Sequence, residues 1–378
     1  MSFTSVLPNL VHINIWNCEG CKHLPKIEQL PSLRELHLGG LTSIEYIDDY
    51  FSSGGPTGGG NELDNDESLM SSPFPSSSSR GGGGRRERAP PPPTTFFPSL
   101  KYLTLEFMPN LKGWWRMSKL AAAEDQELSL LPSFPCLIES LIRYCPKLTS
   151  MPLQPTVVKL ELWEVREKLV QQQLLMKTKT TMVAATRSSS SSLVLPLSNL
   201  EELVVSVDQV TLPEAAFQRL TSIRKLVIGG CPRRTSLSRW MLHLTALRSL
   251  HINDCQEIDL SDIGDDNANL TSLTIERIPK LKSLPAGLLH FTTLQHLTIK
   301  YCENLMSLPE WIGSLTSLQQ LYICDSPRLN SLPEGVQRLT TLQHLEIEFS
   351  SQELYDRCQE ETEEDWPKIA HIPKVLIY

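Results

Sequence analysis

Two cysteines near the amino terminus have a spacing that can support chemistry. Cys18 and Cys21 form a C-x-x-C motif within the stretch WNCEGCKHLP. A pair of this kind can ligate zinc or run a thiol–disulfide cycle. The same spacing also arises where the two residues have no chemical role, so the surrounding elements decide between these interpretations.

Motifs of the common catalytic and nucleotide-binding families are absent from the sequence. It contains no G-x-x-x-x-G-K-[ST] phosphate loop, no G-x-S-x-G nucleophile motif and no H-E-x-x-H zinc motif. The run GGGGRRER has the glycines of a phosphate loop but no Lys followed by Ser or Thr. We therefore expect a protein that is not an enzyme and that holds no cofactor and no metal.

Composition limits the classes of partner that we expect for this protein and the cellular compartment in which we expect to find it. The 378 residues carry a net charge of −8, so nothing in the charge balance favours a nucleic-acid partner. The sequence contains no apolar run of about 18 residues, so it predicts no membrane span. Its first residues lack the pattern of a secretory signal. The nine cysteines then indicate free thiols in a reducing compartment. We expect a cytoplasmic protein, with the nucleus as a second location.

A repeat organises the chain. The units LQHLTIKYCENLMSLPEWIGSLTS (294–317) and LQQLYICDSPRLNSLPEGVQRLTT (318–341) align with apolar residues at positions 1, 4, 6, 12 and 15 and Pro at 16. Position 1 falls at Leu10, Leu33, Leu100, Leu137, Val157, Leu200, Ile223, Leu247, Leu270, Leu294, Leu318 and Leu342. The last seven are separated by 23, 24, 23, 24, 24 and 24 residues, within the roughly 20–29-residue period of leucine-rich repeats.

This pattern predicts the architecture. Positions 1 to 6 form a short strand, in which positions 4 and 6 face inward while positions 3, 5 and 7 face outward. Stacked units give an α/β leucine-rich-repeat solenoid, or horseshoe, with a parallel β-sheet on the concave face. Segments such as LPEWIGSL and LPEGVQRL predict short helical turns or loops on the convex face.

We expect a solenoid of about 12 repeats over residues 1–348 and a C-terminal cap over residues 349–378. A first insert, residues 52–95, is rich in Gly, Ser and Pro, which predicts a disordered loop. A second insert spans residues 166–196, and a helix is expected from Glu164 to about Met182. The side chains expected against or over the core are Leu169, Leu174 and Leu175 of that helix, Trp114 and Trp115 at the core edge, and Trp366, Ile369 and Ile372 of the cap.

The repeat register also sorts the cysteines. Cys18 falls at position 9, where the turn accepts a small buried side chain. The same position holds Cys145, Cys231, Cys255 and Cys302. Cys21 falls at position 12, where other units have Leu. We therefore expect both sulfurs of the C-x-x-C motif to replace core residues rather than to form a zinc or redox site.

Histidines fall at outward positions of the predicted sheet. Position 3 holds His12, His296 and His344, and position 5 holds His37 and His251. A metal site requires three or four convergent ligands. His296 and His344 are two repeats apart, roughly 10 Å at ~4.8 Å per strand, which is too far to share an ion. Solvent-facing or partner-facing histidines are the favoured interpretation.

The outward positions of the regular half, roughly residues 223–349, form the candidate protein-binding face. Aromatic residues set among charged ones suit such a face, and Trp16 and Trp163 extend it toward the amino terminus. The candidate residues are His251, Asp254, Glu276, Arg277, His296, Lys300, Tyr301, Tyr322, Asp325, His344, Glu346 and Phe349.

Several stretches carry a family likeness. LPNLVHINIWNCEGCKHLPKIEQLPSLRELHLGGLTSIEYI, FPSLKYLTLEFMPNLKGWW and EDWPKIAHIPKV resemble the C-terminal leucine-rich repeats of plant nucleotide-binding leucine-rich-repeat disease-resistance proteins of the coiled-coil class. The resemblance implies an intracellular immune-receptor module for pathogen recognition in the defense response. It implies protein partners: a pathogen effector or host target, and the receptor's nucleotide-binding domain, which the repeats hold inactive. The sequence departs from that family by lacking the coiled coil and the nucleotide-binding domain, as expected of a fragment, a truncated product or a decoy.

Two other classes of function compete with this one. A substrate adaptor of a ubiquitin ligase also carries Cys at the turn, but usually at a longer period, and no F-box-like segment precedes Leu10. An extracellular receptor ectodomain predicts Asn at the turn, a signal peptide and paired capping cysteines. A general protein-binding scaffold is the remaining alternative.

Overall fold

The computed structural model describes residues 7–25, 27–28, 30–48, 97–115, 133–175, 197–206, 217–230, 235–236, 238–256, 258–259, 269–360 and 364–378. The insert expected at 52–95 lies outside the described residues. So does the part of the second insert that follows residue 175.

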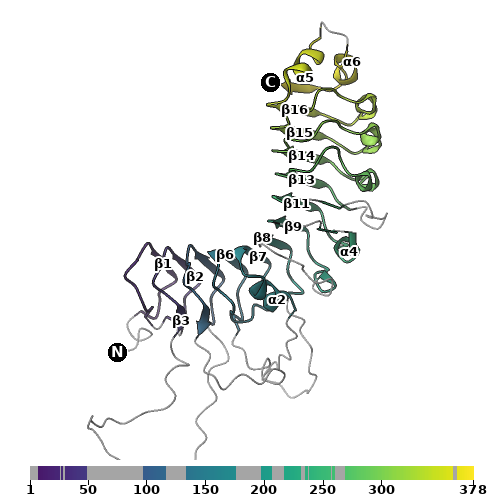
Figure 1. Ribbon diagram of the computed structural model, residues 1–378. Helices are drawn as coiled ribbons and strands as arrows, with labels where there is room; N and C mark the ends of the chain where they lie inside the picture. Colours follow the sequence, from purple (N-terminus) through teal and green to yellow (C-terminus); the bar gives the residue numbers. More distant parts are fainter. Residues whose placement is uncertain are drawn as a thin grey trace, which may run out of the picture.

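One parallel sheet of 13 strands runs along the described chain (Figure 1). Its strands are β1 His12–Trp16, β2 Glu35–Gly39, β4 Tyr102–Glu106, β6 Glu139–Cys145, β7 Lys159–Val165, β8 Glu202–Ser206, β9 Lys225–Gly229, β11 Ser249–Asn253, β13 Ser272–Glu276, β14 His296–Lys300, β15 Gln320–Cys324, β16 His344–Glu348 and β17 Lys374–Ile377. The first twelve coincide with the twelve repeats. The predicted leucine-rich-repeat solenoid is therefore confirmed, and β17 is an additional strand that the repeat did not predict.

Register between repeats keeps like positions side by side. Leu273, Leu297, Leu321 and Leu345 are neighbours across β13 to β16, and each is at most 1% exposed. A fully buried Leu side chain contributes roughly 1.5–3 kcal/mol. A single strand cannot bury this face, so the core exists only where repeats stack.

The opposite side of the stack is closed by short 3₁₀ helices, as expected. They are η5 Ala286–His290, η6 Glu310–Ser314 and η7 Glu334–Arg338, each following a proline. Figure 1 shows them on the outer side of the bend, with the strands on the inner side. Neighbouring turns come so close that a Cβ on Gly313 would lie 2.5 Å from the carbonyl oxygen of Gly335, which explains glycine at this point.

Smaller elements complete the coils. β3 Tyr46–Asp48 pairs with β5 Gly113–Trp115, and β10 Thr235–Ser236 pairs with β12 Ile258–Asp259, while α4 spans Ser238–Met241. Trp114 and Trp115 of β5 are 0% and 4% exposed. They lie inside the core rather than over its edge, because the Trp114 ring packs among aromatic rings of the same coils.

The helix expected in the second insert is α2, Glu167–Leu175. The expected start at Glu164 is wrong, because strand β7 continues through Val165 and Glu164 has a left-handed backbone with φ 52°. Leu169 and Leu174 are buried against the core as expected. The helix therefore packs on the solenoid directly after β7.

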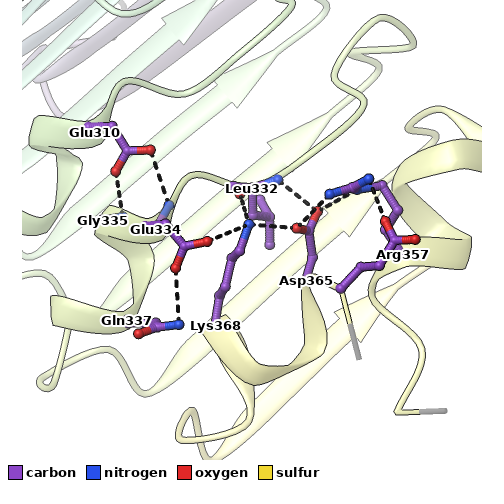
Figure 2. A network of polar contacts seen from close by, with 9 residues as sticks. Glu310, Leu332, Glu334, Gly335, Gln337, Arg357, Asp365 and Lys368 are labelled. Carbon is purple, nitrogen blue, oxygen red and sulfur yellow. Dashed lines mark hydrogen bonds and ion pairs between the residues drawn. The ribbon is translucent and has the colours of Figure 1, made fainter. Parts of the chain in front are cut away.

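Residues 351–360 and 364–378 contain α5 Gln352–Arg357, α6 Trp366–Ile369 and β17, which pairs with β16. Ile369 and Ile372 are buried, and Trp366 packs partly against the core. Figure 2 shows how this segment is held: the Asp365 carboxylate lies between Arg357 and Lys368, and Lys368 reaches Glu334 of η7. The last helices are thus attached to the outer turns as well as to the sheet.

Candidate protein-binding surface

A row of left-handed residues follows the strands at repeat position 8. We call it the strand-end row: Asn17, Gly40, Phe107, Tyr144, Glu164, Gly230, Asp254, Arg277, Tyr301, Asp325 and Phe349. Its non-glycine members have φ between 51° and 56°, a conformation that costs roughly 1–3 kcal/mol outside glycine. Backbone strain of this kind concentrates at functional positions, so the row is a candidate for recognition.

Hydrogen bonds explain why the chain adopts this conformation. The amide of Tyr301 donates to the carbonyl oxygen of Cys324 in the next strand at 3.0 Å, and the amide of Asp325 donates to Glu348 at 3.1 Å. The amides of Asp254 and Arg277 make the equivalent bonds. Each left-handed residue therefore extends the ladder by one bond to the next repeat and leaves its side chain at the edge of the sheet.

Cations and aromatic rings alternate along the C-terminal part of this surface. The Arg277 guanidinium lies 4.8 Å from the centroid of the Tyr301 ring, and the Lys300 ammonium lies 5.1 Å from that of Tyr322. Such contacts stabilise by about 0.5–1 kcal/mol at exposed sites. They fix rings and charges in place before any partner arrives, which lowers the entropic cost of binding.

Glu348 accepts hydrogen bonds from two tyrosine hydroxyl groups near the C-terminal end of the sheet. Its carboxylate accepts from Tyr322 at 2.7 Å and from Tyr378 at 2.6 Å. The hydrogen bonds from Tyr378 and Tyr322 lower the pKa of Glu348. The same bond raises the pKa of Tyr378 to about 12, and burial together with Glu348 raises the pKa of Tyr322. Both phenols stay protonated donors at neutral pH.

The other predicted residues also face outward, and some of them pair. His251 Nε2 lies 3.2 Å from Glu276 Oε2, and burial lowers the pKa of His251 despite this carboxylate. His296 Nδ1 lies 3.2 Å from Gln320 Oε1 on the next strand. His344 and Glu346 are half-buried neighbours along β16. These contacts are pairwise along the sheet and do not converge on one point.

A hollow of about 300 Å³ opens beside the strand-end row. It is lined by Tyr301, Glu303, Asn304, Asp325, Pro327 and Arg328. Two of the predicted residues, Tyr301 and Asp325, therefore border a concave spot that can receive a side chain of a partner.

Sequence reasoning named Trp16 but missed the two aromatic rings that lie with it in the first half of the molecule, Phe107 and Tyr144. The Phe107 ring stacks on Tyr144 with centroids 4.7 Å apart, and Trp16 meets Phe107 edge to face at 6.4 Å. Trp16, Phe107 and Tyr144 are 46%, 49% and 42% exposed, respectively. Phe107 and Tyr144 fall at repeat position 8, as Tyr301 and Phe349 do, so the repeat register could have identified them.

The C-x-x-C motif is only partly a scaffold feature. Cys18 is exposed and Cys21 half-buried, so the expectation that both sulfurs replace core residues is wrong for Cys18. Its strand is the first of the sheet, and no described coil packs on its outer side. In later repeats Cys145, Cys255 and Cys302 are buried at position 9 as expected, and Cys231 lies outside the described residues. Burial raises the pKa of the Cys145 thiol to about 12, which makes it a poor nucleophile.

Comparison with known proteins agrees with the repeat. Residues 1–41 match the family model described as R13L1/DRL21 LRRs. No curated protein matches the sequence.

Several solved structures are similar to this chain. One is the internalin InlF of Listeria monocytogenes, with 12% identity and a TM-score of 0.42, covering 98% of this chain and 88% of that one. Another is the leucine-rich repeat domain of the type III effector XopL, with 18% identity and a TM-score of 0.36, covering 92% and 79%. The third is TLR13 in complex with ssRNA13, with 15% identity and a TM-score of 0.47, covering 99% and 50%. At these identities the likeness concerns the fold alone.

Within the described ranges, no helix is long and apolar enough to cross a membrane.

Proposed function

We propose that this chain is the recognition module of a plant-type intracellular immune receptor. Its concave face binds a protein, either a pathogen effector or a host target, and the same repeats hold a nucleotide-binding domain inactive. The match of residues 1–41 to the R13L1/DRL21 repeats supports this proposal, as does the resemblance of the sequence to plant disease-resistance proteins. The described free cysteines fit a reducing compartment such as the cytoplasm.

The observation that carries the proposal is the strand-end row of the regular half. Tyr301 and Phe349 are 42% and 62% exposed on a rigid parallel sheet. Tyr and Arg dominate the energetics of protein interfaces because they combine apolar area with hydrogen-bonding groups. Arg277, stacked on Tyr301, offers both kinds of group in one place.

Binding rather than catalysis is the activity that this surface supports. Several of its polar side chains are engaged with each other or with tyrosines, as the pairs His251–Glu276 and Lys300–Tyr322 illustrate. The buried thiols have raised pKa values, as in Cys145 and Cys358, both at about 12. Such groups orient a partner but do not activate a nucleophile.

The experiment is a binding screen of candidate effectors and host proteins against the purified chain and a triple variant, Tyr301→Ala, Tyr322→Ala and Phe349→Ala. The matched control is Tyr355→Ala, which removes a tyrosine of 38% exposure from α5, away from the concave sheet. We expect a specific binder to lose at least 100-fold in affinity with the triple variant and to bind the control like wild type.

Autoinhibition is tested separately. The chain is co-expressed in leaf tissue with an autoactive nucleotide-binding domain of a plant resistance protein, and cell death is scored. Suppression by the wild-type chain supports the receptor role. A binder that the triple variant retains at full affinity contradicts the assignment to the concave face, whereas failure to suppress cell death contradicts only the role in autoinhibition.

A further inference from the structure

Three side chains with metal-ligand chemistry converge at the first two strands of the sheet. His12 lies on β1, and Glu35 and His37 lie on β2; one ligand atom from each lies within 4.8 Å of the others. His12 Nδ1 is 2.8 Å from Glu35 Oε2. The two imidazole rings have centroids 5.2 Å apart. Strands β1 and β2 lie at the amino-terminal end of the stack (Figure 1).

The parallel register produces this convergence. His12 is directly opposite Glu35, and Asn14 is opposite His37. Glu35 and His37 are two residues apart on one strand and therefore project from the same face. His12 and His37 are diagonal neighbours, a separation that long side chains bridge. Hydrogen-bonded strands thus hold the three ligands on rigid backbone.

We propose that His12, Glu35 and His37 form a binding site for a divalent transition-metal ion of the zinc class. Two imidazoles and one carboxylate are a ligand set that zinc takes, at bond lengths of about 2.0–2.2 Å in tetrahedral geometry. Ligand atoms of such a site are separated by about 3.3 Å, which follows from those bond lengths. The present separations of up to 4.8 Å require only side-chain rotation of surface residues.

The site has room for a fourth ligand. The side chains of His12 and Glu35 are 49% and 42% exposed, so a water molecule or a ligand from a partner can complete the coordination. An open fourth position distinguishes exchangeable zinc sites from closed structural ones. The ion would therefore sit on the concave surface, where a binding partner can reach it.

Other histidines on the sheet show what this cluster adds. His251 has a carboxylate partner, Glu276, at 3.2 Å, and His296 has the amide oxygen of Gln320. Among the described residues, no other group of three His, Cys, Asp or Glu side chains comes together in this way. A pair of ligands binds zinc far more weakly than three, so the second histidine sets the site apart.

This proposal departs from the expectation of no metal-binding residues. That expectation compared His296 with His344, which are two repeats apart. His12 at position 3 and His37 at position 5 belong to adjacent repeats, and Glu35 at position 3 is directly opposite His12. The register of the repeats makes these residues neighbours, and the structure shows that their side chains meet.

The test is titration of the full chain with Zn²⁺ alone by isothermal calorimetry, using protein purified without a histidine tag and stripped with a chelator. We expect one Zn²⁺ per chain in wild type. His12→Ala and His37→Ala should each weaken binding at least tenfold, and Glu35→Gln should weaken it by a smaller factor. His251→Ala is the matched control and should bind like wild type, because the His251–Glu276 pair lacks a third ligand.

The exposed C-x-x-C motif is the competing zinc ligand, and a second variant isolates it. Cys18→Ser with Cys21→Ser should retain the Zn²⁺ affinity, and Co²⁺ bound to wild type should show ligand-field bands without a thiolate charge-transfer band. Loss of binding in this variant, or wild-type affinity no greater than that of the His12→Ala, His37→Ala double variant, overturns the proposal. Circular dichroism melts of every variant check that the fold persists. The result is independent of the partner-binding proposal, since Tyr301, Tyr322 and Phe349 belong to the other end of the sheet.

Discussion

The ammonium group of Lys368 lies 2.7 Å from the Asp365 carboxylate, and both side chains are almost fully buried. Asp365 also accepts from the Leu332 amide at 3.0 Å, and Lys368 donates to the Leu332 carbonyl oxygen at 2.7 Å. The two side chains of this ion pair therefore form hydrogen bonds with both the amide and the carbonyl group of the Leu332 backbone (Figure 2). This pair holds α6 against the turn that leads into η7.

Replacing Asp365 should loosen the end of the solenoid. Asp365→Asn leaves the buried Lys368 with only the exposed carboxylate of Glu334, at 3.2 Å, and removing the buried partner of a buried ion pair costs about 3 kcal/mol or more. Urea unfolding followed by tryptophan fluorescence measures this loss. Lys368→Met is the comparison, and it should cost less because Arg357 still neutralises Asp365 at 3.1 Å. Equal midpoints for wild type and Asp365→Asn would show that the pair contributes nothing.

The same pair should make stability depend on pH at both extremes. Burial raises the pKa of Asp365, but hydrogen bonds from Arg357, Lys368 and the Leu332 amide outweigh it and lower the pKa overall. Burial lowers the pKa of Lys368, while Asp365 and Glu334 outweigh it and raise the pKa overall. The Asp365 contribution is therefore present above the pKa of an unfolded Asp, about 3.9, and is lost as the pH falls through the folded value.

The Lys368 contribution is present below the pKa of an unfolded Lys, about 10.4, and is lost as the pH rises through the folded value. The melting temperature should fall more steeply between pH 7 and pH 3 for wild type than for Asp365→Asn, because this variant has no carboxyl group to protonate at position 365. Parallel curves for the two proteins would contradict this assignment.

An inward charge should break the stack locally. Leu297 is 1% exposed between Leu273 and Leu321, so Leu297→Asp buries a carboxylate without a partner, at a cost on the order of 4 kcal/mol or more. Because each repeat is stabilised by its neighbours, hydrogen exchange should increase across the repeats on either side. Thr298→Asp, one residue further along the same strand and facing outward, should change the free energy of unfolding by less than about 1 kcal/mol. A circular dichroism melt of Leu297→Asp that matches wild type would rule the argument out.

Thiol accessibility should separate the first repeat from the later ones. Cys18 and Cys136 are exposed, whereas Cys145, Cys255, Cys302, Cys324 and Cys358 are buried. Brief alkylation of the native protein followed by peptide mass spectrometry should label Cys18 and Cys136 first. Burial raises the pKa of the Cys324 thiol to about 11 and that of Cys358 to about 12, so these two should react only after unfolding. Rapid labelling of Cys302 would mean that position 9 is open in the native solenoid.

Sequence periodicity determined the parts of this protein that repeat. Side chains in a strand alternate between two faces, so the apolar residues at positions 4 and 6 could only be the inward ones, and Leu297 and Leu321 are buried accordingly. The 3₁₀ turns after Pro309 and Pro333 followed from the same register. A fixed period of 23 or 24 residues then left a stacked parallel sheet as the fold.

Tertiary structure alone decided which outward residues meet and how the ends are finished. A cross-strand contact such as Arg277 on Tyr301, or His12 with Glu35 and His37, depends on the direction of each side chain. The exposure of Cys18 depends on being at the end of a stack. Periodicity describes an average repeat with a neighbour on both sides, and it carries no information about a side chain's rotamer or about a missing neighbour.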